Sequence, residues 1–166
     1  DKGYEGTLLL GRVTASQDTD GEILSEADCS HVLKVNLERE LGALKGESYQ
    51  LPPMVSAVKI NGQRLYKAAR KGIEVEREPR RIRIDEIKLL SLDPPFARFE
   101  VQCGKGTYVR TIAHDVGQKL GCGACLSALR RIRSGSFSID QAHSLSEVLA
   151  LTPEELEKIL VKTDKP

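Results

Sequence analysis

The chain has 166 residues, with 25 basic and 24 acidic side chains and a hydrophobic fraction of 40%. This length and composition suit one packed domain with a short appendage, and they exclude a globally disordered chain. No apolar stretch approaches the roughly 20 residues that a membrane-spanning helix needs, and no stretch has the pattern of a signal peptide. Four cysteines are too few for a disulfide scaffold, so we expect a reducing, cytoplasmic setting.

The first half of the chain predicts strands and helices in turn. A central apolar run predicts a strand over residues 4–14, and the polar residues 16–21 have the composition of a loop. Leucines spaced four apart predict a helix over 27–44. After two prolines that exclude a helix interior, we expect a short strand over 54–60 and a helix over 63–71.

The second half begins with a hairpin signature, because apolar residues alternate over 81–92 and 96–103 on either side of a proline-rich turn. Residues 107–110 are expected to be extended. Helices are predicted over 111–120 and, after a glycine-rich break, over 124–132. A capping box at Thr152-Pro153-Glu154-Glu155 predicts the start of a last helix. The predicted class is therefore α+β, with antiparallel hairpins and single helices.

Basic residues are clustered although the net charge is close to zero. On the helix predicted over 63–71, a basic stripe is formed by Arg64, Lys67, Arg70 and Lys71. Two arginine clusters follow, at Arg77, Arg80, Arg81 and Arg83 and at Arg130, Arg131 and Arg133. Each could be a solvated face or a contact for phosphate.

Cys122 and Cys125 form a CxxC pair, which is found in redox sites and in halves of zinc sites. A zinc ribbon needs a second ligand pair, but Cys29 and Cys103 stand alone. We therefore prefer the interpretation that Cys122 and Cys125 are small residues packed at a helix start, and we predict no metal.

Residues 103–115 are the densest segment, since two glycines precede an aromatic residue and an arginine that are two positions apart. In an extended stretch, Tyr108 and Arg110 share one face. An aromatic ring beside a guanidinium can hold a planar base or pair a buried carboxylate. The spacing is equally compatible with a core tyrosine next to a surface arginine.

Four short blocks, ordered along residues 2–140, go beyond these local patterns. They are Lys2-Gly3-Tyr4 with Leu10-Gly11-Arg12-Val13-Thr14 and Asp18-Thr19-Asp20-Gly21; Pro52-Pro53-Met54-Val55-Ser56-Ala57-Val58-Lys59 with Leu65-Tyr66-Lys67-Ala68-Ala69-Arg70-Lys71-Gly72; residues 105–115; and Leu120-Gly121-Cys122-Gly123-Ala124 with Leu129-Arg130-Arg131 and Ser134-Gly135-Ser136-Phe137. In these blocks and their order, the chain resembles the TruB-type bacterial tRNA pseudouridine-55 synthases.

The resemblance implies the isomerisation of a uridine to pseudouridine in the T-arm of tRNA, with no cofactor and no obligate protein partner. It implies an α+β fold with a mixed, mainly antiparallel sheet flanked by helices. Residues 1–142 would form the catalytic and RNA-binding domain, and residues 143–166 a C-terminal helical segment. The uridine must be flipped out of the RNA, because a stacked base shields its glycosidic bond.

The resemblance also implies roles for individual residues. Tyr4 stacks on the target base and takes part in removing the C5 proton, Tyr108 lies in the same pocket, and Arg110 pairs the catalytic carboxylate. Leu129 forms an apolar wall. RNA-backbone contacts are expected from Lys59 and Arg70, together with Arg64 and Lys67 of the basic stripe.

The family's nucleophilic aspartate lies in a GxLDPxATG motif that precedes the block of Tyr4. We therefore expect the chain to be a fragment that begins after this motif and is inactive alone. Leu92-Asp93-Pro94 imitates part of the motif but falls at a predicted hairpin turn. The family's C-terminal RNA-binding appendage is expected to be missing or very short. The alternatives are a T-arm-binding domain without activity, a metal or redox protein, and a basic structural domain.

Overall fold

The computed structural model describes residues 1–56, 58–60, 63–65, 73 and 75–160. Its centre is a six-stranded sheet in which every neighbouring pair is antiparallel. From one edge to the other, its strands are β10 (Phe137–Ser138), β9 (Ala124–Ser134), β1 (Lys2–Leu10), β8 (Phe96–Cys103), β7 (Arg80–Asp93) and β4 (Gly46–Gln50). The predicted α+β class with a mainly antiparallel sheet is confirmed.

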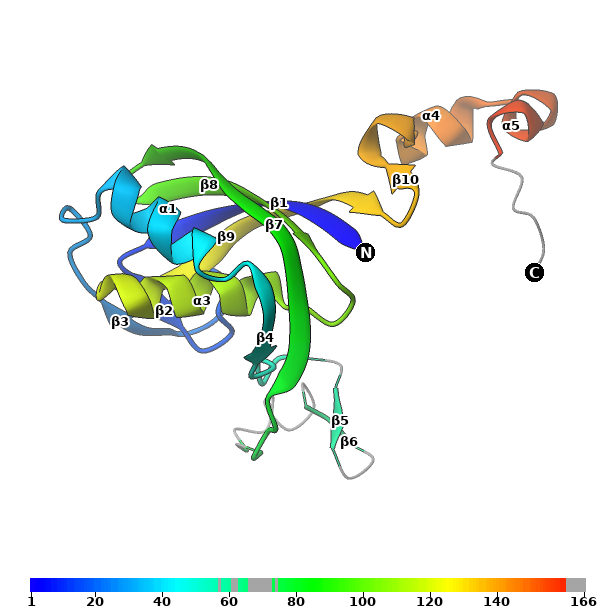
Figure 1. Cartoon of the computed structure of the whole chain (residues 1–166). Coiled ribbons are helices and arrows are strands. Elements are labelled where there is room, and N and C mark those ends of the chain that lie inside the picture. Colours follow the sequence, from blue (N-terminus) through cyan, green and yellow to red (C-terminus); the bar gives the residue numbers. More distant parts are fainter. Residues whose placement is uncertain (57, 61–62, 66–72, 74, 161–166) are drawn as a thin grey trace.

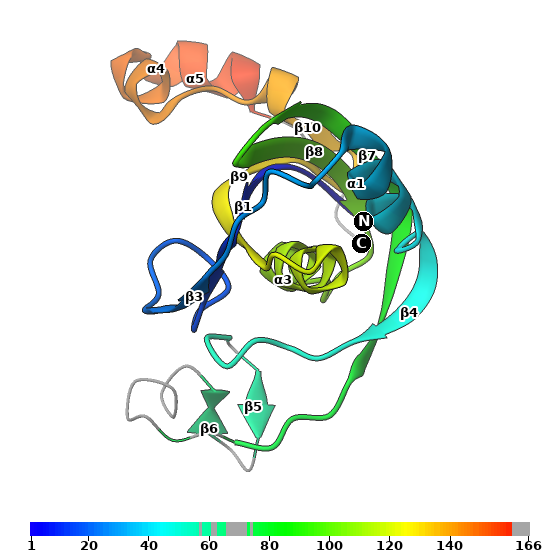
Figure 2. The same cartoon turned by 90° about the vertical axis from the view of Figure 1, so that its left-hand side faces the viewer.

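Two helices, α1 (Lys34–Gly42) and α3 (Val109–Leu120), lie against one face of this sheet, which curves around α3 (Figures 1 and 2). The core fills the space between them. It contains Leu37 and Leu41 of α1, Ile112 and Val116 of α3, and the sheet residues Leu8, Ile84, Phe99 and Val101. Burying this apolar face is what fixes the helices on the sheet.

The remaining elements are small. Two-stranded ribbons are formed by β2 (Arg12–Thr14) with β3 (Ile23–Glu26) and by β5 (Lys59–Ile60) with β6 (Gln63–Arg64). After the sheet come a 3-10 turn, η1 (Ile139–Gln141), and the helices α4 (Leu145–Ala150) and α5 (Pro153–Ile159), which extend away from the body (Figure 1). Within the described parts of the chain, no helix has the length and apolar character that crossing a membrane requires.

Several predicted elements are confirmed. The hairpin forms from β7 and β8, and the last helix begins with the capping box between Thr152 and Glu155. The strand predicted over 4–14 is present but breaks at Gly11, which has a positive φ of 80°. A side chain there would lie 2.5 Å from the carbonyl oxygen of Ala27, so only glycine fits this corner.

The helix predicted over 124–132 is wrong, because these residues form β9 and pair with β1. Two bulges in this pairing explain the misleading pattern. They make residues 124, 126, 129 and 131 lie opposite Leu10, Leu8, Gly6 and Tyr4, which share one face of β1. The inward positions of β9 are thus two or three residues apart, so the strict alternation that predicts a strand is lost.

Three other expectations are corrected in part. The helix predicted over 27–44 begins only at Lys34, because residues 27–33 form a turn whose first amide donates to the carbonyl of Gly11. In the strand predicted over 54–60, only Lys59–Ile60 is extended in a ladder. Gln63–Arg64, predicted to be helical, forms β6, whereas residues 66–71 of that prediction lie outside the described residues.

Candidate functional site

Tyr4 and Leu129 lie on the same face of the sheet. Tyr4 is opposite Arg131 in the β1–β9 pair, and Leu129 is opposite Gly6. The side chains of Tyr4, Arg131 and Leu129 therefore point to the side of the sheet on which α3 packs. Gly6 leaves no room for a side chain, since a Cβ atom there would lie 2.7 Å from the ring of Phe99. Leu129 remains 48% exposed and is available for an apolar contact.

Tyr4 is partly buried against the core. Burial raises the pKa of its phenol above the ordinary value, and the nearby thiol of Cys103 acts in the same direction. The nearby guanidinium of Arg131 lowers the pKa in part. The Tyr4 side chain is therefore held as a neutral phenol at neutral pH, with a cation beside its oxygen.

Arg110 connects three segments of the chain. Its Nη1 atom lies 2.9 Å from Oδ2 of Asp18 and also donates to the carbonyl of Ser16. Its Nη2 atom donates to the carbonyl of Val55 over 2.7 Å. The side chains of Arg110 and Asp18 are only 22% and 26% exposed, so their charges interact with reduced screening by water.

Asp18 belongs to the loop between β2 and β3, and this loop is fastened to β9. The amide of Thr19 donates to the carbonyl of Leu126, and the amide of Leu126 donates to the carbonyl of Gln17. The Asp18–Arg110 pair is thus attached to β9 at Leu126, three residues before Leu129. Tyr4 lies opposite Arg131, two residues after Leu129. The candidate site is therefore a strip along β9. The Asp18–Arg110 pair forms its polar end, Leu129 lies in the middle, and Tyr4 forms its aromatic end.

Tyr108 is the last residue before α3 and has an extended backbone. Its prediction as extended is confirmed, but α3 already begins at Val109, so Arg110 lies in the first helical turn rather than on a strand. The backbone of Tyr108 is held by the side chain of Gln50, at the end of β4. Tyr108 and Arg110 are therefore positioned by the same helix start. Tyr108 contacts Gln50 at the end of β4, and Arg110 contacts Val55, five residues later.

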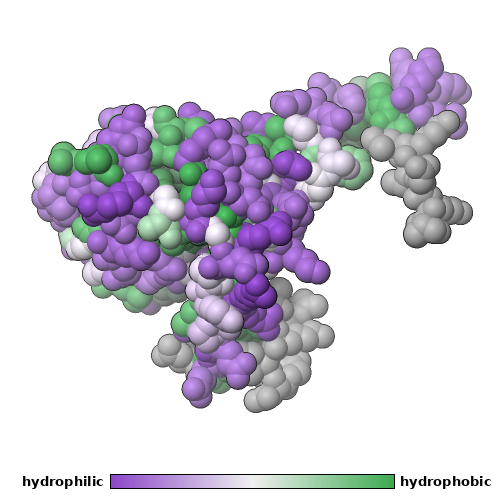
Figure 3. Space-filling model, viewed as in Figure 1, coloured by the Kyte–Doolittle hydropathy of each residue, from purple (hydrophilic) through white to green (hydrophobic). Residues whose placement is uncertain are grey.

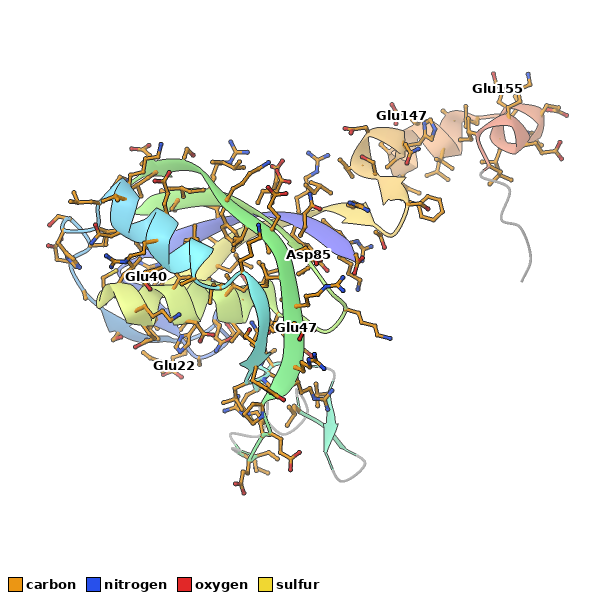
Figure 4. The ribbon with its side chains drawn as sticks, in the orientation of Figure 1. Glu22, Glu40, Glu47, Asp85, Glu147 and Glu155 are labelled. Carbon is orange, nitrogen blue, oxygen red and sulfur yellow. The ribbon has the colours of Figure 1, made fainter. Side chains whose placement is uncertain are left out.

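The other predicted residues are only partly described. The backbones of Lys59 and Arg64 are paired in the β5–β6 ribbon, whereas Lys67 and Arg70 lie outside the described residues. Within the arginine cluster that starts at Arg77, Arg81 pairs with Glu47 and Arg83 with Asp1 and Asp85. Figure 4 shows Glu47 on β4 and Asp85 on the adjacent β7. Part of this cluster is thus engaged within the molecule.

Cys122 and Cys125 flank the start of a strand, not of a helix, and burial raises the pKa of both thiols. In the described part of the chain, no three histidine, cysteine, aspartate or glutamate side chains are grouped as metal ligands. Reasoning from local patterns missed Asp18, which was treated as a loop residue although it lies in the first block. It also missed Gln50, for which the sequence carries no signal.

The chain belongs to the TruB family of pseudouridylate synthases. Residues 1–109 match the TruB family pseudouridylate synthase (N terminal domain), and residues 110–165 match the tRNA pseudouridylate synthase B C-terminal domain. The chain is 50% identical, over 161 residues, to the tRNA pseudouridine synthase B of Opitutus terrae, and 45% identical to that of Syntrophotalea carbinolica. These matches cover 97% of this chain, and 67% and 53% of the two relatives.

Solved structures agree with the fold. The chain resembles a protein in the crystal structure of a Cbf5-Nop10-Gar1 complex with a TM-score of 0.69 and 24% identity, over 95% of this chain and 40% of that one. A structure of an H/ACA RNP bound to a substrate RNA containing 2'-deoxyuridine matches with a TM-score of 0.59 and 21% identity, over 89% of this chain and 33% of that one. The chain thus spans only part of the length of the proteins it matches.

Proposed function

We propose that the protein containing this chain isomerises a uridine in the T-arm of tRNA to pseudouridine. Family membership and the names of the relatives support the reaction and the tRNA substrate. The observation that carries the proposal is the partly buried Asp18–Arg110 pair, fastened to β9 beside Leu129. Leu129 offers an apolar contact for the flipped base, and the charged pair at the end of the strip can hold the carboxylate that attacks it.

In this proposal, the flipped uridine lies along the strip. The ring of Tyr4 stacks on the base, and Leu129 forms the apolar wall that replaces the lost base stacking. A part for Tyr4 in removing the C5 proton rests on the Arg131 guanidinium beside its oxygen, which favours the phenolate, because the raised pKa by itself keeps the phenol protonated at neutral pH. Tyr108 closes the pocket from the start of α3.

We infer that the nucleophile is the aspartate of the GxLDPxATG motif, which the resemblance places before the block of Tyr4, and that Arg110 holds it ionised. A guanidinium has five N–H donors, of which three are used here, so Arg110 can keep its bond to Asp18 and donate to a second carboxylate. Asp93 does not fit this role, because it lies at the β7–β8 turn and pairs with Phe96, which pairs with Leu9. Its strand, β7, is three strands away from β9, to which the Asp18–Arg110 pair is attached, and at about 4.8 Å per strand this is roughly 14 Å.

RNA binding involves the basic residues Lys59, Arg64, Lys67 and Arg70. Their charges would contact the phosphates on either side of the flipped nucleotide. Affinity should therefore fall steeply as the salt concentration rises. Residues 1–142 form the catalytic and RNA-binding domain, and the segment from 143 is an appendage; none of the residues in α4 and α5 is buried, which supports this division. A cytoplasmic location stays a prediction.

The test is tritium release from C5-labelled uridine by the complete protein, in an unmodified T-arm stem-loop and in an anticodon stem-loop. Release from the T-arm alone, with pseudouridine found at one position, is the expected result. No release from either RNA would overturn the proposed reaction. If salt-sensitive binding to the T-arm persisted without release, the alternative of a T-arm-binding domain without activity would replace it.

A further inference from the structure

Gln50 is a buried polar residue whose side chain bonds to the backbone of a single distant residue. It ends β4 and is only 5% exposed. Its Oε1 atom accepts from the amide of Tyr108 over 2.8 Å, and its Nε2 atom donates to the carbonyl of Tyr108 over 3.1 Å. Both polar ends of the Gln50 carboxamide are therefore used on one residue of the candidate site.

This contact replaces a strand pairing that the backbone does not make. Tyr108 is extended, with φ −98° and ψ 109°, and the helix that follows has no side-chain cap of its own. A carboxamide offers one acceptor and two N–H donors, so it can pair with an extended residue as a neighbouring strand would. Because an unpaired buried amide is costly, Gln50 fixes Tyr108 firmly.

The segment after Gln50 then holds the other side of the helix start. Pro52 and Pro53 are fully buried, and their rings restrict the backbone of this stretch. Five residues after Gln50, the carbonyl of Val55 accepts from Nη2 of Arg110. Residues 50–55 thus hold Tyr108 by its backbone and Arg110 by its guanidinium.

We propose that Gln50 is a positioning residue for the isomerisation, which fixes the start of α3 so that Tyr108 and Arg110 face the flipped uridine together. It touches neither the base nor the nucleophile and acts only through these two residues. This inference rests on the proposed function and deepens it. A displacement of about 1 Å at a reacting group can cost a factor of about 100 in rate, so loss of this contact should affect the chemical step more than RNA binding.

The test uses two variants of the complete protein. Gln50→Met keeps the length of the side chain and removes both hydrogen bonds, and Gln50→Glu keeps an acceptor for the Tyr108 amide but loses the donor. Ser48→Ala is the matched control, because Ser48 lies two positions earlier on the same face of β4. For each, we would measure the single-turnover rate of pseudouridine formation at saturating protein, the Kd for the T-arm stem-loop, and the melting temperature.

The expected result is a rate about 10- to 100-fold lower for Gln50→Met and at least as low for Gln50→Glu, because its buried carboxylate would face the Tyr108 carbonyl. The Kd of both variants and the rate of Ser48→Ala should stay within about threefold of wild type. A Gln50→Met rate within twofold of wild type would overturn the inference. So would rate losses that only follow loss of folded protein in both variants, because Gln50 would then serve stability alone. If wild type itself made no pseudouridine, the proposed function would fail first.

Discussion

At the scale of single residues, the candidate site depends on the hydrogen bonds and the ion pair that the Arg110 guanidinium makes. Arg110 is not a surface arginine beside a core tyrosine, because it bonds Asp18 and two carbonyl groups from separate segments. The sequence predicted Tyr108 and Arg110 as a pair, since both lie in one motif. It could not predict their partners, because Asp18 and Gln50 are 92 and 58 positions away from Arg110 and Tyr108, respectively.

Replacing Asp18 tests the importance of the partly buried ion pair. Asp18→Asn keeps the shape of the side chain but removes the charge that orients the Arg110 guanidinium. We expect the single-turnover rate of pseudouridine formation to fall by about 10-fold or more, with RNA affinity nearly unchanged. Asp20→Asn, two residues later on the exposed side of the loop, is the control. Equal rates for the two variants would show that Asp18 has no role in the reaction.

Tyr4 should leave a signature in the pH dependence of stability. Because burial raises the pKa of Tyr4 in the folded protein, the folded state keeps the phenol proton at a pH where the unfolded state has lost it. The free energy of unfolding should therefore fall as the pH rises above about 10. Buried thiols add to this fall. Urea unfolding of Tyr4→Phe between pH 8 and 11 should show a shallower fall, whereas an unchanged slope would argue against a buried phenol.

At the scale of elements, sequence patterns predict those helices and strands that are determined by contacts between residues close together in the sequence. The β7–β8 hairpin follows from alternation on both sides of a turn. The register of β9 does not, because its bulges depend on pairing with β1, which is more than 100 positions away in sequence. The shortened start of α1 likewise depends on the bond between Ala27 and Gly11. Tertiary contacts override the local preference in both places.

The close approach of α3 to the start of β9 gives a sharp prediction at this scale. A Cβ atom at Gly117 would lie 2.0 Å from the backbone nitrogen of Ala124, and backbone atoms cannot easily move away. Gly117→Ala should lower the free energy of unfolding by about 3 kcal/mol. Gly42→Ala, at the end of α1, meets no atom within 4 Å and should raise it by about 0.5 to 1 kcal/mol. Urea unfolding of both variants measures these changes. Equal changes in the free energy of unfolding would contradict the close packing of Gly117 against Ala124.

At the scale of the whole molecule, a packed body carries a thin C-terminal extension. Apolar residues appear on this extension in Figure 3, and Leu145 and Leu149 are 73% and 76% exposed. The sequence predicted the last helix from its capping box, and capping boxes also begin η1 and α4. These short helices are thus held by local hydrogen bonds rather than by a shared core.

Removing the extension should therefore cost little stability. We expect residues 1–142 to melt within about 3 °C of the whole chain, because a change of 1 kcal/mol shifts the melting temperature of a domain of this size by roughly 2–4 °C. Differential scanning calorimetry of the two chains is the measurement. A clearly larger decrease would show that the extension packs on the body and that the division at residue 142 is wrong.

Under the proposed function, Arg110 serves the isomerisation of a uridine rather than the binding of RNA. The most direct measurement compares wild type and Arg110→Ala, in the complete protein, for pseudouridine formation in a T-arm stem-loop and for its Kd. We expect turnover to be abolished while much of the affinity for the T-arm remains. Near-normal turnover by Arg110→Ala would contradict the role assigned to this arginine.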